Sequence, residues 1–287
     1  MIVKTRYILL LALISGCGKP SDTVSQAPKL SHIATSEVSH ATSPEEDVTI
    51  LARQLGDSDP KVRFTAAEAL WRMGPKCAPA LPQLIEHIDD EEWAHFENPR
   101  RGAEVRTMVD RAIGQIEDGV VPLLLKCLHS PKPARRRNAA ELLAARKDLR
   151  AVEPMINLLT DSSRLVRAVV AERLGYFAAP QAALPLRAAL KDDDWYVRMK
   201  AASALARTKS SEVVPDLIVA LQDSEENVRS AAAEALGVIE HAGSVQALTT
   251  AAKVDKSQYV RRAATESLNR IGKLKEQQNI AIDGGNE

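Results

Sequence analysis

Residues 192–205 read DDDWYVRMKAASAL, and residues 223–236 read DSEENVRSAAAEAL. Both stretches place Asp at the first position, Val-Arg at the sixth and seventh, and Leu at the fourteenth. Residues 161–174, DSSRLVRAVVAERL, carry the same pattern 31 residues before the first of them. Recurrence at a fixed period of roughly 20–50 residues is the sequence signature of repeat proteins, whose units bury their apolar faces against one another. The pattern therefore predicts a repeat array.

The recurrent Arg extends the array in both directions along the chain. Successive Arg residues are 43, 30, 31, 31, 31 and 32 positions apart, and they are Arg63, Arg106, Arg136, Arg167, Arg198, Arg229 and Arg261. An aliphatic residue follows each Arg by seven positions, and Ala follows most of them by four. These columns predict about seven units of about 31 residues each, over residues 47–272.

Each unit is expected to contain two helices joined by a short turn. Residues 213–221, VVPDLIVAL, illustrate the first helix, with Pro215 in the first turn, where a missing N–H costs no hydrogen bond. The second helix is expected to begin after a capping residue four positions before the Arg, such as Asp194 before Arg198. Apolar residues then recur at helical spacing along one face. The predicted fold is all-α, an α-solenoid of two-helix repeats.

Five of the seven Arg residues are preceded, six positions earlier, by an Asp: Asp57, Asp161, Asp192, Asp223 and Asp255. With the Val-Arg pair and an Ala-Ala-x-x-Leu pattern, this spacing resembles the HEAT repeat, and the 31-residue length is most similar to the short repeats of the phycobilisome-lyase class. The resemblance implies an Asp–Arg ladder that runs through the turns from unit to unit. A guanidinium fork suits that role, since it can bind a carboxylate and turn carbonyls together. Because each of these Arg residues has its own Asp, we interpret the column as structural rather than as a phosphate-binding strip.

Two units depart from this pattern. Arg100 stands where an Asp is expected before Arg106, and Ser130 stands where one is expected before Arg136. The ladder is therefore in question at both places.

The 43-residue first step implies an insertion of about 12 residues, near residues 89–102. Loops held by a rigid scaffold are frequent contact surfaces. Aromatic side chains would anchor a protein interface, and carboxylates would favour a basic partner. The candidate contacts here are Glu91, Glu92, Trp93 and Phe96. The alternative is a surface loop whose Trp93 folds back over the solenoid.

A second candidate surface is the concave face that the second helices of a solenoid present. The position five after each Arg is mostly acidic, and it includes Glu68, Glu141, Glu172, Glu234 and Glu266. This column predicts an acidic stripe, with Glu141, Glu172 and Glu234 as candidate partner contacts. The alternative is a solvated stripe whose charges support their own helices, as in an i,i+4 pair of Glu68 with Arg72.

The N-terminal residues are expected to be a targeting signal and not part of the fold. Lys4 and Arg6 precede a seven-residue apolar run, which is too short to span a bilayer, so residues 1–16 are expected to be a signal peptide. Residues 13–17, LISGC, resemble the lipobox of bacterial lipoproteins, and the resemblance implies acylation of Cys17. An ordinary secretory signal with a chance cysteine is the alternative. Residues 17–46 lack apolar periodicity and are expected to form a flexible tether, and residues 273–287 a polar tail.

Composition excludes several classes of function. The 38 Lys+Arg and 38 Asp+Glu residues cancel, which argues against a nucleic-acid-binding protein, and aromatic residues are only 3%. Three cysteines are too few for a disulfide scaffold. The sequence has no P-loop and no dinucleotide-binding motif, and it lacks the His-Glu pairs of a di-iron deoxyhypusine hydroxylase. We therefore expect no catalytic residues, no metal and no cofactor.

The function expected from the sequence is that of a membrane-anchored, non-catalytic scaffold in the bacterial cell envelope, which binds a protein or peptide through its solenoid. The lipid on Cys17 would be its only membrane contact, and the protein would face the periplasm. Gly18 after Cys17 favours the outer membrane if the cell is Gram-negative. The alternatives are a bilin-lyase-like or other HEAT-type enzyme or chaperone, and a structural subunit of an envelope complex. The partner, the membrane and the oligomeric state stay open.

Overall fold

A computed structural model describes residues 44–95, 103–177 and 179–283. The chain divides into two units, Met1–Ala41 and Thr42–Glu287, and all of the described residues lie in the second. Cys17, the signal peptide, most of the tether and Phe96 lie outside the described residues. Within the described ranges, no helix combines the length and the apolar character that crossing a bilayer requires.

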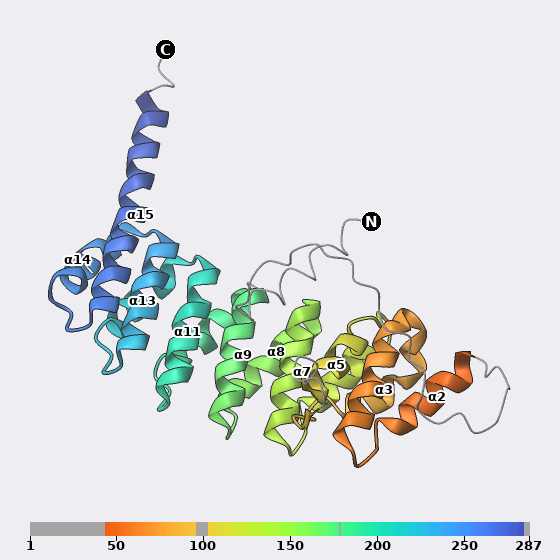
Figure 1. Ribbon diagram of the computed structural model, residues 1–287. Helices are drawn as coiled ribbons and strands as arrows, with labels where there is room; N and C mark the ends of the chain where they lie inside the picture. Colours follow the sequence, from red (N-terminus) through yellow and green to blue (C-terminus); the bar gives the residue numbers. More distant parts are fainter. Residues whose placement is uncertain (1–43, 96–102, 178, 284–287) are drawn as a thin grey trace, which may run out of the picture. The chain divides into compact units, whose positions relative to one another are not determined.

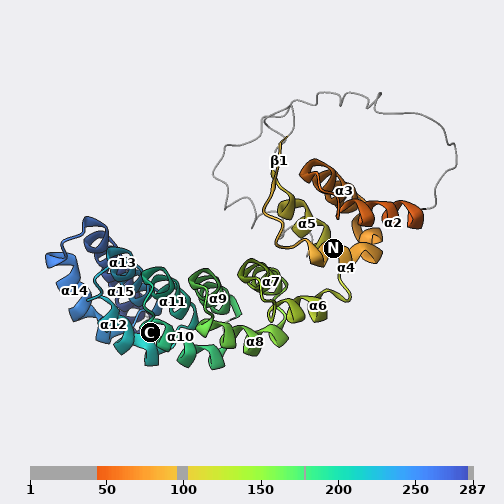
Figure 2. The same ribbon diagram turned by 90° about the horizontal axis from the view of Figure 1, so that it is seen from below.

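The described residues form seven pairs of helices, which confirm the predicted all-α solenoid of two-helix units (Figure 1). The first helices of the pairs are α2 (Pro44–Gln54), α4 (Leu81–Glu86), α6 (Val120–Cys127), α8 (Val152–Asn157), α10 (Ala183–Ala189), α12 (Val214–Ala220) and α14 (Val245–Val254). The second helices are α3 (Pro60–Arg72), α5 (Val105–Ile113), α7 (Pro133–Arg146), α9 (Arg164–Phe177), α11 (Trp195–Thr208), α13 (Glu226–Ile239) and α15 (Gln258–Asp283). From α6 onward, Figure 2 shows the first and second helices as two separate layers.

Short 3-10 turns lead into most of the first helices, and capping residues begin several second helices. The turns are η1 (Gly74–Ala80), η2 (Leu149–Ala151), η3 (Leu158–Thr160), η4 (Pro180–Ala182), η5 (Ser211–Val213) and η6 (Ala242–Ser244), of which η3 follows α8 instead. Asp194 caps α11 by accepting a hydrogen bond from the Tyr196 N–H, and Asp59 caps α3 in the same way. These caps satisfy N–H groups that the first helical turn leaves without partners.

Small residues let consecutive second helices approach closely. A Cβ atom added to Gly175 in α9 would lie 2.8 Å from the Cα of Ala204 in α11. One added to Gly237 in α13 would lie 2.3 Å from the hydroxyl of Ser267 in α15. Both distances are too short for a real side chain, so these two positions require glycine. The apolar core between the helix layers is correspondingly rich in buried alanine and leucine.

The described residues of the insertion include a short pair of strands. Trp93–Ala94 (β1) pairs antiparallel with Ala103–Glu104 (β2), with Trp93 opposite Glu104. Ala94 is fully buried, whereas Trp93 is 47% exposed. The amide of Arg106 donates to the carbonyl of Asp90 at 2.9 Å, so the extra residues leave and rejoin the array between these two positions.

The last helix continues beyond the expected end of the solenoid. α15 is 26 residues long and reaches Asp283, past residue 272, where a polar tail was expected to begin. In Figure 1 its C-terminal half projects beyond the neighbouring helices α13 and α14. Residue 272 is therefore not a helix end.

Candidate functional site

The Asp–Arg ladder links each repeat to the next one. In α11, Nη1 of Arg198 donates to the carbonyl of Asp192 at 2.8 Å, within its own turn. The other edge of the same guanidinium donates to the carboxylate of Asp223, from Nε to Oδ2 at 2.7 Å and from Nη2 to Oδ1 at 2.9 Å. Both side chains are mostly buried. One arginine thus ties its own turn to the turn of the following repeat.

The same arrangement corrects the expected pairing. Arg136, Arg167 and Arg229 bind carboxylates 25 or 26 residues later, in Asp161, Asp192 and Asp255 respectively. The Asp six residues before an Arg therefore supplies its main-chain carbonyl, and its carboxylate belongs to the Arg of the preceding repeat. This explains why Arg136 takes part in the ladder although Ser130 precedes it: Nη1 of Arg136 needs only the Ser130 carbonyl, at 2.7 Å.

The arginines hold the ladder carboxylates in their charged form. Burial raises the pKa of Asp161, Asp192 and Asp223, but hydrogen bonds from the guanidinium and from one backbone amide more than offset it, so each pKa lies below its ordinary value. A hydrogen bond from the guanidinium of Arg229 likewise lowers the pKa of Asp255. Charge-assisted hydrogen bonds of this kind are among the stronger ones in proteins.

Asp90 is a ladder residue that the sequence pattern did not identify. Nε of Arg63 donates to Asp90 at 2.6 Å and Nη2 donates to Glu92 at 2.7 Å. Burial raises the pKa of Asp90, but His87 and Arg63 together lower it to about 2. Asp90 lies 27 residues after Arg63, close to the spacing of the other pairs. The six-residue pattern did not identify Asp90, because the insertion separates it from Arg106 and places Arg100 six residues before Arg106.

The ladder is interrupted between the second and third units. Arg106 has no Asp at position 130, and it binds Asn138 at 2.5 Å and Glu141 at 3.4 Å instead. Helices α5 and α7 are barely in contact, whereas the other consecutive second helices pack closely. At the C-terminal end, Arg261 keeps only its carbonyl contacts, with Asp255 and Lys256.

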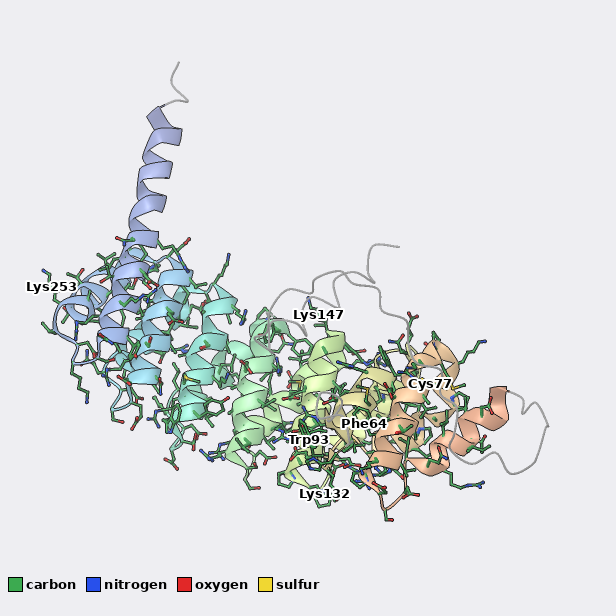
Figure 3. All side chains as sticks on the ribbon, in the orientation of Figure 1. Phe64, Cys77, Trp93, Lys132, Lys147 and Lys253 are labelled. Atoms are coloured by element: carbon green, nitrogen blue, oxygen red, sulfur yellow. The ribbon has the colours of Figure 1, made fainter. Side chains whose placement is uncertain are left out.

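Basic residues of α7 and of its preceding turn engage the acidic residues of the insertion. Asp89 pairs with Arg135 at 2.7 Å and with Lys132 at 3.3 Å, and Glu91 pairs with Arg137. Glu92 pairs with Arg63, as described above. The chain's own basic residues therefore neutralise these carboxylates, which leaves little electrostatic attraction for a basic partner. Trp93 remains 47% exposed, and Figure 3 labels it near the middle of the array in that view.

The exposed side of the second helices, called the second-helix face here, carries the predicted glutamate column. Glu172 of α9 pairs with Lys200 of α11 at 2.8 Å. Glu141 of α7 lies 3.4 Å from Arg106 and 3.9 Å from Arg173. Toward the ends of the array, the corresponding pairs are Glu68 with Arg72 and Glu266 with Arg262. Glu234 is exposed and accepts a hydrogen bond from the Ser230 hydroxyl at 3.5 Å. Basic side chains thus balance most of the column, and the face is not an acidic stripe.

Arginine side chains lie over aromatic rings at two places on this face. The guanidinium carbon of Arg207 is 4.2 Å from the ring centroid of Tyr176, and that of Arg173 is 5.8 Å from it. Arg111 of α5 lies over Trp71 of α3 at 5.6 Å. Tyr176 is 42% exposed. We call these five side chains the arginine–aromatic surface. The candidate contacts predicted from the sequence did not include them.

A carboxyl group interrupts the small-residue column that packs the second helices. Asp110 stands four residues after Arg106, where five other units have Ala67, Ala140, Ala171, Ala202 and Ala233. Its Oδ1 is buried and accepts no hydrogen bond within the described residues. Burial raises the pKa of Asp110 to about 7, although Arg106 opposes the shift and Glu141 and Glu104 add to it. The described residues contain no cluster of three or more His, Cys, Asp or Glu suited to a metal ion.

Two-helix units joined by an arginine ladder define the protein as an α-solenoid of helical repeats. A family model of HEAT repeats matches residues 101–175, 152–218 and 183–269, and a second HEAT-repeat model matches residues 48–77. These matches cover more than half of the chain, which therefore belongs to the HEAT-repeat family. No curated protein sequence matches the chain.

Several solved structures are similar to the chain. The complex of CpcE and CpcF of phycocyanin lyase from Nostoc sp. PCC7120 is 23% identical, with 85% of this chain and 100% of that chain covered and a TM-score of 0.43. Human deoxyhypusine hydroxylase is 19% identical, with 80% and 97% covered and a TM-score of 0.36. A mutant of Kap121p is 15% identical, with 79% and 29% covered and a TM-score of 0.59. At these identities the likeness concerns the fold alone.

Proposed function

We propose that the protein is a membrane-anchored, non-catalytic scaffold of the bacterial cell envelope, which captures a protein or peptide partner on its second-helix face. The observation that carries the proposal is the arrangement of Tyr176, Arg173 and Arg207. These side chains come from two consecutive second helices that the ladder fixes in register, and they present an exposed aromatic ring with guanidinium groups over it. Tyrosine and arginine are the residue types that most often anchor protein interfaces.

The insertion is the weaker of the two candidate surfaces. Four of its carboxylates are paired with the chain's own basic residues, so a partner would have to displace existing ion pairs. Trp93 remains as a single exposed aromatic group on β1. We therefore place the partner on the second-helix face and keep Trp93 as the position that tests the choice.

The anchor rests on the N-terminal sequence. The lipobox-like residues 13–17 support acylation of Cys17, and several acyl chains on one residue meet the requirement for stable attachment. The residues between Cys17 and α2 would hold the solenoid at a distance from the bilayer. Gly18 after Cys17 favours the outer membrane in a Gram-negative cell.

One experiment tests both parts. The full chain and the variants Cys17→Ser, Tyr176→Ala and Trp93→Ala are expressed in a bacterial host and separated by detergent-phase partitioning, and crosslinked partners are then purified from native membranes. We expect Cys17→Ser to leave the detergent phase, and Tyr176→Ala to stay there but lose at least three-quarters of the crosslinked partner. Trp93→Ala should retain both properties. Unchanged partitioning of Cys17→Ser would refute the lipid anchor, and partner loss in Trp93→Ala alone would move the site to the insertion.

A further inference from the structure

We propose that the arginine–aromatic surface recognises an acidic polypeptide segment, whose Asp and Glu carboxylates bind Arg111 and Arg207. The inference rests on the proposed function, because it names the chemistry of the partner that the second-helix face would capture. It reverses the expectation of a basic partner that the acidic residues of the sequence suggested.

Arg207 contacts an aromatic ring without using its hydrogen-bond donors. Its guanidinium carbon lies 4.2 Å from the centroid of the Tyr176 ring, a cation–π contact. Arg207 is exposed, and no carboxylate among the described residues pairs with it. A guanidinium that already rests against an aromatic ring loses less conformational entropy when it binds a carboxylate with two hydrogen bonds.

Arg111 repeats this arrangement at the other end of the surface. It is exposed and lies over Trp71, and its Nη1 contacts the sulfur of Met108 at 4.0 Å. Among the described residues no carboxylate pairs with Arg111 either. Arg173 of α9 lies 5.8 Å from the Tyr176 ring but is already 3.9 Å from Glu141, so Arg111 and Arg207 are the groups available to the partner's carboxylates.

Other arginines of the chain have guanidinium groups that are already bound to carboxylates of the same chain. Arg198 in the ladder uses both edges of its guanidinium on Asp192 and Asp223. Arg187, in the layer of first helices, pairs with Asp216 at 2.6 Å. Arg111 and Arg207 have no such carboxylate among the described residues, and charge complementarity to these two exposed groups calls for an acidic partner.

The glutamates on the same face favour a polypeptide over a nucleic acid. Glu141, Glu172 and Glu234 lie along the second helices in the same region as Arg173 and Arg207. A nucleic-acid backbone carries a charge at every short step and would meet these carboxylates. An acidic polypeptide can space its carboxylates to meet the arginines only, and its apolar residues can cover the Tyr176 ring.

The test measures binding of a fluorescein-labelled 20-residue peptide of alternating Glu and Ser to the full lipidated chain in detergent. The variants are Arg207→Gln, Tyr176→Ala and the matched control Arg150→Gln, which removes one exposed positive charge at η2, next to the first helices. Circular dichroism melting checks that each variant folds. We expect Arg207→Gln and Tyr176→Ala to weaken binding at least fivefold, Arg150→Gln to change it less than twofold, and higher salt to weaken binding by the native chain.

Three results would overturn the inference. They are absence of Glu-peptide binding by the native chain, equal losses in Arg207→Gln and Arg150→Gln, and equal or tighter binding of a Lys-Ser peptide or of single-stranded DNA that depends on Arg207. If the Glu peptide does not bind while the Tyr176→Ala chain still loses its crosslinked partner in native membranes, the acidic chemistry is wrong and the scaffold proposal stands. If the Tyr176→Ala chain keeps that partner, the scaffold proposal itself fails.

Discussion

Arg198 and Asp223, one repeat apart, form two charge-assisted hydrogen bonds of 2.7 and 2.9 Å, while the Asp192 carbonyl in the same turn as Arg198 takes its third contact. The ladder is therefore an interaction between repeats rather than within them. It fixes the register of neighbouring second helices, which in turn brings Tyr176 of α9 under Arg207 of α11.

A double-mutant cycle can test whether Arg198 pairs with the Asp of the next repeat or with the Asp of its own turn. We predict that Arg198→Ala and Asp223→Ala together destabilise the protein by less than the sum of the single changes, with a coupling of about 1–3 kcal/mol, because either change alone leaves a mostly buried charge without its partner. The coupling between Arg198→Ala and Asp192→Ala should be clearly smaller, since Arg198 hydrogen-bonds only the carbonyl of Asp192 and acts on its carboxylate through longer-range attraction alone. Urea unfolding of the four variants of each cycle measures both values. A larger coupling with Asp192 would reverse the assignment.

Acid should weaken the ladder in a defined range. The folded-state pKa of Asp90 is lowered to about 2, below its ordinary value of 3.8, so its contribution is complete above about pH 4 and is lost as the pH falls toward 2. A shift of this size corresponds to about 2 kcal/mol. We predict that Asp90→Asn is less stable than the native protein at pH 6, and that the difference shrinks between pH 4 and pH 2. A constant difference over that range would show that Arg63 does not stabilise the charged form.

Asp110 should have the opposite pH dependence. Its pKa is raised to about 7, so the folded state holds a proton that the unfolded state releases at lower pH, and stability falls as the pH rises from about 4 to 7. Asp110→Ala restores the residue found at this position in five other units. We predict that this variant is more stable than the native protein by about 2 kcal/mol at pH 8, and that the gain is small near pH 4. Thermal unfolding at the two pH values measures the difference, and equal stability at pH 8 would contradict a buried, poorly paired carboxyl.

Helix ends offer an independent stability test. Lys147 is the C-cap of α7 and has a φ of 53°, in the left-handed region. The residue at the same repeat position after α3 is Gly74, which has a φ of 63°. We predict that Lys147→Gly stabilises the protein by about 0.5–1 kcal/mol, because glycine adopts this conformation without strain. The control Lys147→Ala should give no such gain, since it keeps the Cβ atom. Equal effects of the two changes would point to the lost charge instead.

The sequence predicted the repeats because their columns lie within one helix or one turn. The spacing of Arg and Leu in residues 192–205 was enough to place α11, and similar stretches placed the other second helices. The direction of the ladder was missed because the six-residue Asp–Arg spacing is more conspicuous than the spacing of 25 residues. Pairing across the insertion was also invisible, since Arg135 meets Asp89 from 46 residues away.

The arginine–aromatic surface could not be predicted from spacing alone. Tyr176 and Arg207 share a position in their repeats, nine residues after the Arg, but their contact depends on how closely α9 and α11 approach. That approach is set by Gly175 against Ala204, a packing relationship between two repeats. The glutamate column was identified, yet its neutralisation by Lys200 and Arg173 again required the geometry of neighbouring helices.

Site-specific photo-crosslinking in native membranes tests the central claim most directly. The photoreactive residue p-benzoylphenylalanine is placed at one of three positions. Position 145 lies on α7 in the second-helix face, position 219 on α12 in the first-helix layer, and position 93 on the insertion. Ala145 shares the repeat position of Tyr176 and Arg207, and Val219 is 72% exposed. We predict a light-dependent adduct of one defined mass from the Ala145 variant, which disappears when Arg207→Gln is added, and none from the Val219 variant. An adduct from the Val219 or Trp93 variant with none from the Ala145 variant would contradict partner binding on the second-helix face.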